Sequence, residues 1–149
     1  MFLYFWKVSV LFQSILLVDD DNDDQLLFKE ALSEVNGGMH CYIANGGIDA
    51  LEILNSPDAV FPDLIIMDVN MPIMNGIECL IELKKSEKLR SIPVIMYSTS
   101  CSNECQKDCM DNGAAGDMEK PSDYSVFCAQ IRHILNFGIP ANRKKPAFL

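Results

Sequence analysis

The stretch ILLV at residues 15–18 is wholly apolar and stops abruptly at Asp19. An apolar run without polar alternation is typical of a strand buried on both faces of a parallel sheet. Apolar side chains then recur at helical spacing through residues 23–35, and this pattern ends before the NGG at residues 36–38. The segment therefore predicts a buried strand followed by a helix.

The same strand and helix unit recurs along the rest of the chain. Four further units are expected: a strand at 41–44 with a helix at 48–54, a strand at 64–67 with a helix at 76–85, a strand at 94–97 with a helix at 103–112, and a strand at 115–119 with a helix at 122–136. Such units imply a parallel sheet with helices on both faces. We therefore predict an α/β fold with a doubly wound five-stranded parallel sheet, a flavodoxin-like three-layer sandwich whose ligand crevice lies beyond the carboxyl ends of the strands.

Composition limits the possible functions. The chain has 149 residues, room for one domain, and its 49% hydrophobic content is that of a globular protein with a real core. Twelve basic and 21 acidic residues give a net charge of −9, which would repel a polyanion. No nucleic-acid partner is expected.

The ends of the chain lie outside the repeated units. Residues 1–14 are expected to be an apolar N-terminal extension, either irregular or introduced during cloning. Its apolar run is shorter than the ~20 residues of a membrane span, is interrupted by Lys7, and lacks the basic start and cleavage site of a secretory signal. We expect residues 15–136 to form the domain, residues 137–149 to form a solvated tail, and the protein to be cytoplasmic with no membrane partner.

Six cysteines in a chain without a convincing secretory leader indicate free thiols in a reducing compartment, so no disulfide is expected. Cys101, Cys105 and Cys109 recur every four residues, which would place them along one helix face. Three thiolates on consecutive turns of a straight helix cannot surround one zinc ion tetrahedrally. We therefore expect small buried hydrophobes rather than a metal or redox site. The other cysteines on apolar faces are given the same role: Cys41, Cys79 and Cys128.

Polar residues follow directly after the expected strands. They are Asp19, Asp20, Asp68, Ser98 and Lys120. The carboxyl ends of parallel strands share one edge of the sheet, so these side chains should converge there. Three crowded carboxylates repel one another, and a divalent cation relieves that repulsion. All-oxygen ligands favour a hard ion, which predicts Mg²⁺, with Mn²⁺ as a second ion that fits, rather than zinc.

Asp68 is the acid that stands alone at its strand end. A carboxylate can attack phosphorus to form an aspartyl phosphate. The transferred phosphoryl group carries charge on its equatorial oxygens, so catalysis consists mostly of positioning and electrostatic stabilisation. A metal ion, Lys120 and Ser98 would supply those elements.

The acids that open the first helix have a structural interpretation. Acidic side chains complement the positive end of a helix dipole. We expect this role for Asp21, Asp23 and Asp24, with Asp21 or Asn22 at the helix start.

Four segments resemble the response-regulator receiver domain of bacterial two-component signalling, and the chain is similar to the stand-alone chemotaxis-type receivers. The segments are ILLVDDD at 15–21, DLIIMDVNMPIMNG at 63–76, IPVIMYSTS at 92–100 and GAAGDMEKP at 113–121. The resemblance implies a phosphorelay protein, not an enzyme acting on a separate substrate. Its implied partners are a sensor histidine kinase or phosphotransfer protein and an unidentified downstream protein, which would dock on the fourth and fifth helices and the strand between them.

The resemblance also implies a role for each strand-end residue. Asp68 would be the phosphoacceptor, Ser98 the switch hydroxyl and Lys120 the phosphoryl-binding lysine. It suggests, too, that the Lys120–Pro121 bond is cis, which costs little before proline. The implied metal ligands are Asp20, Asp19 acting largely through water, Asp68, and the backbone carbonyl of Asn70.

Two positions depart from the family pattern. Beside Ser98, where receivers commonly have a very small residue, this chain has Thr99, which would narrow the path to the phosphoryl group. Three residues before the lysine, where receivers usually carry an aromatic that turns inward on activation, this chain has Asp117. Burying an unpaired carboxylate costs several kcal/mol. We therefore expect Asp117 to stay exposed and the loop at residues 99–103 to carry the activation signal, with Tyr97 reorienting.

Two alternative functions fit parts of this pattern. Haloacid-dehalogenase-type phosphatases also place a nucleophilic aspartate after a parallel strand, but they use a second aspartate two residues on as general acid. Here that position is Asn70, which cannot donate a carboxyl proton. A degenerate receiver that serves only as a binding module stays open.

Overall fold

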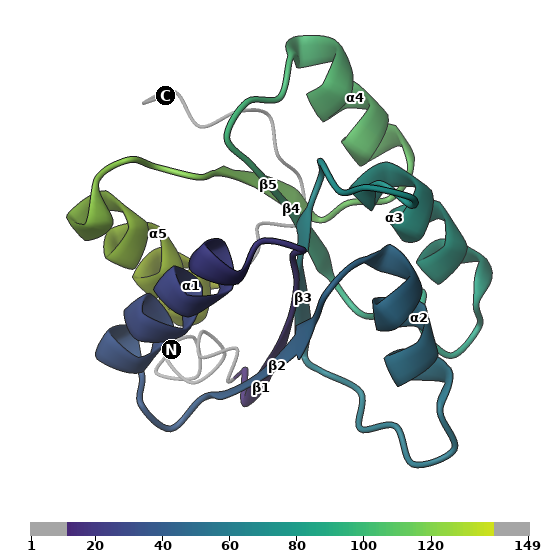
Figure 1. Ribbon diagram of the computed structural model, residues 1–149, viewed down its shortest axis with the longest axis horizontal. Helices are drawn as coiled ribbons and strands as arrows, with labels where there is room; N and C mark the ends of the chain where they lie inside the picture. Colours follow the sequence, from purple (N-terminus) through teal and green to yellow (C-terminus); the bar gives the residue numbers. More distant parts are fainter. Residues whose placement is uncertain (1–11, 139–149) are drawn as a thin grey trace, which may run out of the picture.

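A computed structural model describes residues 12–138 as five strands and five helices that alternate along the chain (Figure 1). The strands are β1 (Ser14–Val18), β2 (His40–Ala44), β3 (Leu64–Asp68), β4 (Val94–Ser98) and β5 (Gly116–Glu119). The helices are α1 (Asn22–Val35), α2 (Gly47–Asn55), α3 (Gly76–Lys85), α4 (Asn103–Asp111) and α5 (Tyr124–Phe137). All ten elements predicted from the sequence are confirmed, with ends that agree to within about two residues.

The expectations for the two ends of the chain fall almost entirely outside the described residues. Residues 1–11 and 139–149 are in this group, so neither the N-terminal extension nor the C-terminal tail is tested. Within residues 12–138, no helix is both long and apolar enough to span a membrane.

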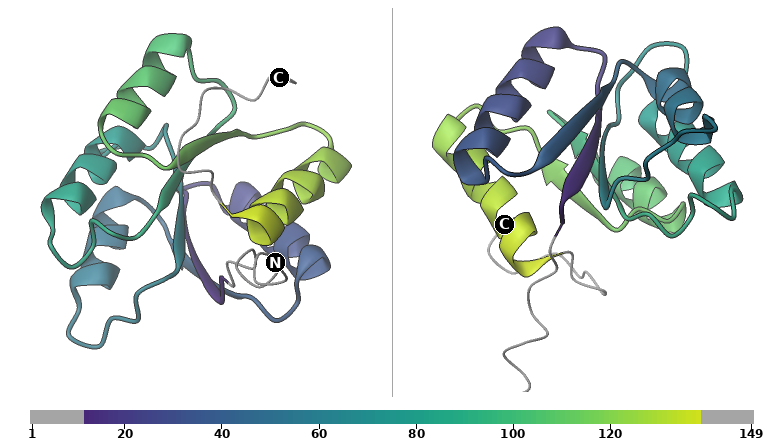
Figure 2. Two further views of the ribbon diagram at one scale, coloured as in Figure 1. Left: turned by 180° about the vertical axis from the view of Figure 1, so that it is seen from behind. Right: turned by 90° about the horizontal axis from the view of Figure 1, so that it is seen from below.

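The strands form one parallel sheet in the order β2-β1-β3-β4-β5. Helices α1 and α5 cover one face, and α2, α3 and α4 cover the other (Figures 1 and 2). The chain leaves β1 toward β2 and then crosses back to β3, so the order reverses between β1 and β3. This arrangement confirms the doubly wound, three-layer fold, and its crevice lies where the order reverses.

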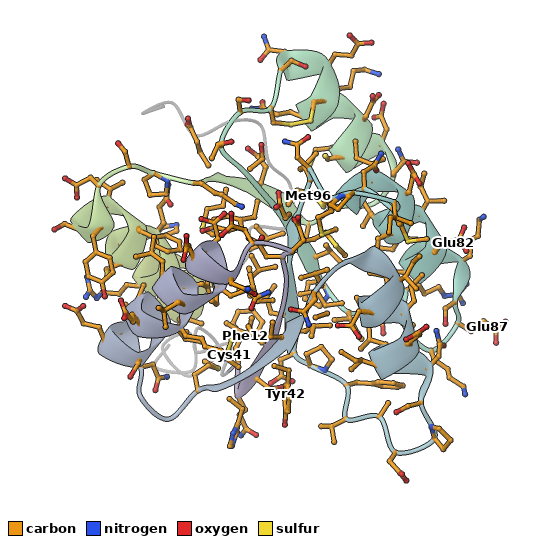
Figure 3. All side chains as sticks on the ribbon, in the orientation of Figure 1. Phe12, Cys41, Tyr42, Glu82, Glu87 and Met96 are labelled. Atoms are coloured by element: carbon orange, nitrogen blue, oxygen red, sulfur yellow. A yellow bond between two sulfur atoms is a disulfide. The ribbon has the colours of Figure 1, made fainter. Side chains whose placement is uncertain are left out.

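The core is split into two clusters by the sheet. Ile15 and Leu17 pack on the side of α1 and α5, whereas Leu16 and Val18 pack on the side of α2, α3 and α4. In β3 and β4 all five residues of each strand are buried. Side chains fill the space on both sides of the sheet, among them Met96 of β4 (Figure 3). Burial on both faces is why these strands are continuous apolar runs.

Side-chain caps fix where the helices begin. The Asp21 carboxylate accepts hydrogen bonds from the backbone N–H groups of Asp23 and Asp24, which confirms it as the N-cap of α1. Asn75 caps α3 by accepting from the N–H of Glu78. These caps satisfy N–H groups that have no partner inside the helix, and they set the helix starts close to the carboxyl ends of the strands.

The expected cis bond between Lys120 and Pro121 is wrong, because residues 12–138 contain no cis peptide bond. With the trans bond, the Lys120 ammonium already lies 3.0 Å from a carboxylate oxygen of Asp19. The cis isomer is therefore not needed to bring the lysine to the acids.

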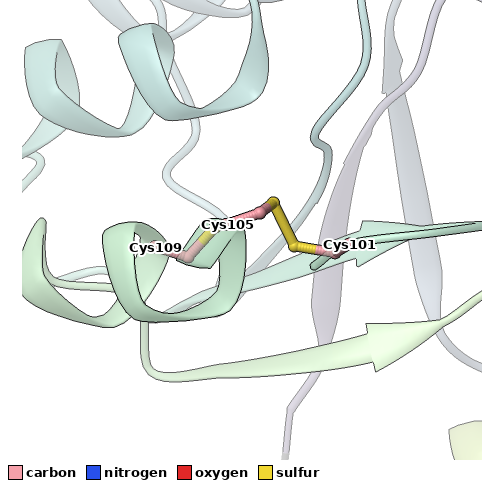
Figure 4. Close-up of side chains that lie close together, drawn as sticks. All are labelled: Cys101, Cys105 and Cys109. Atoms are coloured by element: carbon pink, nitrogen blue, oxygen red, sulfur yellow. A yellow bond between two sulfur atoms is a disulfide. The ribbon is translucent and has the colours of Figure 1, made fainter. Parts of the chain in front are cut away.

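The expectation of no disulfide is also wrong, because Cys101 and Cys105 are bonded (Figure 4). Cys101 lies in the loop before α4, so the three cysteines do not share a helix face. The loop turns back on the helix and brings the two Cα atoms to 5.4 Å, within the range that a disulfide bridges. Both residues are half-buried, not buried. The other cysteines are free thiols: Cys79, Cys109 and Cys128 are buried as expected, and Cys41 is half-buried.

Gly76 lets the start of α3 approach the end of β3 closely. A Cβ atom at this position would collide with the carbonyl oxygen of Asp68 and lie 2.9 Å from the Cα of Val69. Both are backbone atoms, which cannot move aside as a flexible side chain can. The absence of a side chain at position 76 therefore permits this close approach of α3 to the end of β3.

We predict that Gly76→Ala lowers the free energy of unfolding by about 1–3 kcal/mol, the usual cost of overpacking. Urea denaturation of the purified protein measures the change. Gly37→Ala is the matched control, because its Cβ would meet only an ordinary contact with the Ser33 carbonyl oxygen at 3.5 Å. That control should change stability by no more than about 0.5 kcal/mol. Equal stability of the two variants would contradict the prediction.

Candidate functional site

Two buried acids meet at the carboxyl edge of the sheet. Asp19 follows β1 and is 0% exposed, and Asp68 ends β3 and is 5% exposed. Because β1 and β3 are neighbours in the sheet, their carboxylates lie side by side. Oxygen atoms of these two acids and of the exposed Asp20 all lie within 4.8 Å of one another. The structure thus brings together the three carboxylates that the sequence placed at strand ends.

Lys120 reaches this acidic cluster from the end of β5. Its ammonium lies 3.0 Å from Asp19 and 3.3 Å from Asp68, and its side chain is only 10% exposed. A third carboxylate, that of Asp24 on α1, lies 2.8 Å away. In the part of the chain that the structure describes, the ion pairs at this edge all go to Lys120. With Asp20, four carboxylates therefore face one lysine charge.

The sequence assigns Asp24 only to the helix dipole and does not predict its contact with Lys120. The residue does lie in the first turn of α1, as expected. Its place in the chain carried the missing signal, because Asp24 follows Asp19 by only five residues and lies in the first turn of the helix that begins just after β1. A helix that starts at the strand edge points one face of its first turn toward the ligand crevice.

Backbone N–H groups orient the buried acids. One oxygen of Asp19 accepts from the N–H of Asp21 at 2.9 Å, and one oxygen of Asp68 accepts from the N–H of Asn70 at 3.1 Å. In both acids the second oxygen contacts Lys120. Each carboxylate is thus fixed at both oxygens, and the backbone of Asn70 contacts the Asp68 side chain.

The pKa values of the cluster are shifted by burial and by charge. Burial raises the pKa of Asp68 and of Asp19, even though Lys120 and the backbone N–H groups act to lower both. Burial alone would lower the pKa of Lys120, but hydrogen bonds to Asp24 and Asp19 outweigh it, and the pKa rises above its usual value. The ammonium therefore stays charged while the buried acids remain poorly compensated.

This donor set fits a hard divalent cation. The ligands are crowded carboxylate oxygens, and the Lys120 charge does not balance them. Mg²⁺ takes oxygen ligands, commonly one or two carboxylates with several waters. The exposure of Asp20 leaves one side of the cluster open to such waters.

Ser98 ends β4 beside Asp68 and is 4% exposed. Its hydroxyl donates a hydrogen bond of 2.7 Å to the carbonyl oxygen of Ser100, in the loop before α4. The hydroxyl is thus committed to that loop and not to the acids. Asp117 on β5 is exposed, as expected for a carboxylate that cannot be buried unpaired.

Lys120 contacts a cluster of three aromatic side chains. The Tyr97 ring stacks on Phe127 with centroids 5.9 Å apart, and Phe28 meets it edge-on at 6.3 Å. The Lys120 ammonium lies 4.6 Å from the centroid of Tyr97. A cation over an aromatic face is stabilised by the ring quadrupole. Burial raises the pKa of Tyr97, so its hydroxyl remains neutral.

Known proteins are similar to this chain in sequence and in fold. The chain is 33% identical to the two-component response regulator ORR13 of Oryza sativa subsp. japonica, covering 83% of this chain and 95% of that protein. It is 32% identical to the probable transcriptional regulator ycf29 of Pyropia yezoensis, covering 81% of this chain but 52%, about half, of that protein. The phosphorylated cyanobacterial phytochrome response regulator RcpA superposes with a TM-score of 0.76 at 27% identity, covering 83% of this chain and 94% of that chain.

The family assignment follows from the match along the chain itself. Residues 15–132 match the response regulator receiver domain, and this match includes all four segments that carried the resemblance. The chain belongs to the response regulator receiver domain family of two-component systems.

Proposed function

We propose that Asp68 accepts a phosphoryl group from a sensor histidine kinase or a phosphotransfer protein, in the presence of Mg²⁺. Phosphoacceptance is the general role of the family. The observation that carries the proposal for this chain is the setting of the Asp68 carboxylate, which is held between the Asn70 N–H and the Lys120 ammonium beside two further acids.

The chemistry proposed for Asp68 is a displacement at phosphorus. A carboxylate oxygen forms the new O–P bond, the P–N bond to the donor histidine breaks, and the released imidazole nitrogen takes up a proton. Lys120 lies where it can neutralise charge on a phosphoryl oxygen, and its contacts with Asp19 and Asp24 hold it there. The Mg²⁺ ion, or Mn²⁺ in its place, would be held by Asp20, Asp68, the Asn70 carbonyl and, through water, Asp19. The bound ion would offset negative charge at the site.

The phosphorylated state would differ from the free state at Ser98. A phosphoryl group shifts a conformational equilibrium only through contacts that differ between the two states. For Ser98 to bond a phosphoryl oxygen, its hydroxyl must give up the Ser100 carbonyl. The loop at residues 99–103 would then move, while Asp117 stays in solvent.

The wider context is part of the same proposal. The receiver would comprise residues 15–136, with residues 1–14 and 137–149 as flanking segments, and it would work in the cytoplasm. A downstream protein would dock on α4, β5 and α5. The loop that carries the Ser100 carbonyl leads directly into α4, which supports this surface as the output.

We predict that Asp68→Asn abolishes the incorporation of an acid-stable, base-labile phosphate from acetyl phosphate with Mg²⁺. The neutral amide of asparagine lacks the negative charge that makes the carboxylate oxygen nucleophilic toward phosphorus. Phosphate-affinity gel electrophoresis measures the modified fraction, and Asp58→Asn, at an exposed position, is the control that should keep full labelling. Labelling of the Asp68 variant at the wild-type level would defeat the assignment, and absence of labelling in the wild-type protein would favour a receiver that acts only as a binding module.

We predict that Asp20→Asn weakens Mg²⁺ binding by roughly 10-fold or more, since losing even an outer-shell partner of a metal costs that much. Calorimetric titration with magnesium chloride measures the affinity. Asp23→Asn removes an equal charge from the exposed side of α1 and should leave the titration within about twofold of wild type. If both variants bind alike, the metal site lies elsewhere.

We predict that Ser98→Ala removes the phosphorylation-dependent change in the loop at residues 99–103, whereas Asp117→Ala preserves it. The serine hydroxyl supplies a contact that differs between the two states, and Asp117 does not. Hydrogen exchange of this loop, with and without acetyl phosphate and Mg²⁺, measures the change. An equally severe loss in both variants, with labelling of Asp68 intact, would show that Asp117 takes part.

A further inference from the structure

We propose that Cys101 and Cys105 form a reversible dithiol–disulfide site that exchanges with small-molecule disulfides, and that its closed form ties the loop at residues 99–102 to α4. The two sulfur atoms are bonded in the structure, and their residues are four apart in sequence (Figure 4). Family membership assigns no role to either cysteine.

The accessibility of the pair supports exchange. Cys101 and Cys105 are both half-buried, whereas Cys79, Cys109 and Cys128 are buried free thiols. Cys105 also lies in the first turn of α4, so its bond to Cys101 joins the loop to the start of that helix. In a reducing compartment, disulfides of this kind are typically transient and redox-sensing. The pair therefore differs from the structural cysteines of the core.

A metal site is the competing use of these sulfur atoms, because Cys109 Sγ also lies within 4.8 Å of the other two. Burial raises the pKa of the Cys109 thiol, and the nearby Asp117 and Asp108 raise it further. A metal ligand must be a thiolate. With the other two sulfurs already bonded to each other, the geometry favours a closed pair with Cys109 as a neighbouring, reduced thiol.

The exchange proceeds in two balanced steps. The thiolate of one cysteine attacks a sulfur of the small disulfide, the S–S bond breaks, and one small thiolate leaves. The second cysteine thiolate then attacks the protein sulfur of the mixed disulfide and displaces the second small thiolate. The two protein sulfurs are oxidised, the small disulfide is reduced to two thiols, and these take up the two protons that the cysteines release.

Closure of the pair restrains the loop next to the phosphorylation site. The Ser98 hydroxyl donates to the carbonyl of Ser100, and Cys101 is the next residue. The loop is further joined to α4 by the N-cap bond from the Cys105 N–H to the Ser102 hydroxyl, at 3.1 Å. The disulfide adds a covalent tie to this link. Any effect of the disulfide on phosphorylation rests on the proposed function of Asp68. The thiol–disulfide exchange and the restraint of the loop do not depend on that function.

The exchange is tested on the full chain in buffers of oxidised and reduced glutathione, followed by alkylation and intact mass measurement. We expect the oxidised buffer to leave two fewer thiols alkylated, and reduction to restore them. Cys101→Ser should lose at most one alkylated thiol, as a mixed disulfide of Cys105 with glutathione that the intact mass identifies, and Cys41→Ser, at another half-buried thiol, should keep the loss of two. Alkylation that does not depend on the buffer would overturn the proposal. So would protection of all three thiols of the reduced protein by one equivalent of zinc, which would indicate a metal site.

The restraint is tested by hydrogen exchange without any phosphodonor. We expect residues 99–105 to exchange severalfold more slowly in the oxidised than in the reduced protein, with no change in α2, and no redox effect in Cys101→Ser. Equal exchange in the two states would overturn the restraint. Labelling of the reduced protein with acetyl phosphate is measured separately. If that labelling fails while the redox effects remain, the failure belongs to the assignment of Asp68 and not to the cysteines.

Discussion

The Lys120 ammonium is the charge on which the whole carboxyl edge of the sheet depends. It bridges Asp19 after β1, Asp24 on α1 and Asp68 at the end of β3, so one side chain from the end of β5 joins four elements. Removing one partner of a buried ion pair leaves an uncompensated charge and is strongly destabilising, although such a pair adds little net stability compared with apolar packing. The value of Lys120 to the fold is therefore organisational, because it fixes the positions of acids that would otherwise repel one another.

The same lysine connects the acidic cluster to the helices on one face of the sheet. It lies over Tyr97, whose ring contacts Phe28 of α1 and Phe127 of α5. Ser98, the next residue of β4, is bonded instead to the loop that leads into α4 on the opposite face. Tyr97 and Ser98, consecutive residues of β4, thus connect the carboxyl edge of the sheet to the helices on its two faces. In this chain the buried aromatic next to Ser98 is Tyr97, on β4.

Much of this arrangement could be predicted from the sequence, because it depends on local patterns. Apolar runs marked the buried strands, helical periodicity marked the helices, and the rule that parallel strands end at one edge brought Asp19, Asp68 and Lys120 together. The failures concern residues whose position depends on how a segment bends in space. Asp24 was assigned by its place in a helix and not by what that helix turn faces. Cys101 was assigned by a period of four, but the helix begins only after it, and the loop turns back to place it on Cys105.

The reach of Lys120 also has a consequence for how the protein is made. The lysine and Asp19 are 101 residues apart in sequence, and the lysine and Asp68 are 52 apart. During synthesis the N-terminal strands leave the ribosome first, so the acids emerge well before their counter-charge. A nascent chain that ends before β5 carries the carboxylates without the ammonium that pairs with them. The edge can be completed only when almost the whole domain has been translated, so a truncated chain could not imitate the finished protein at this site.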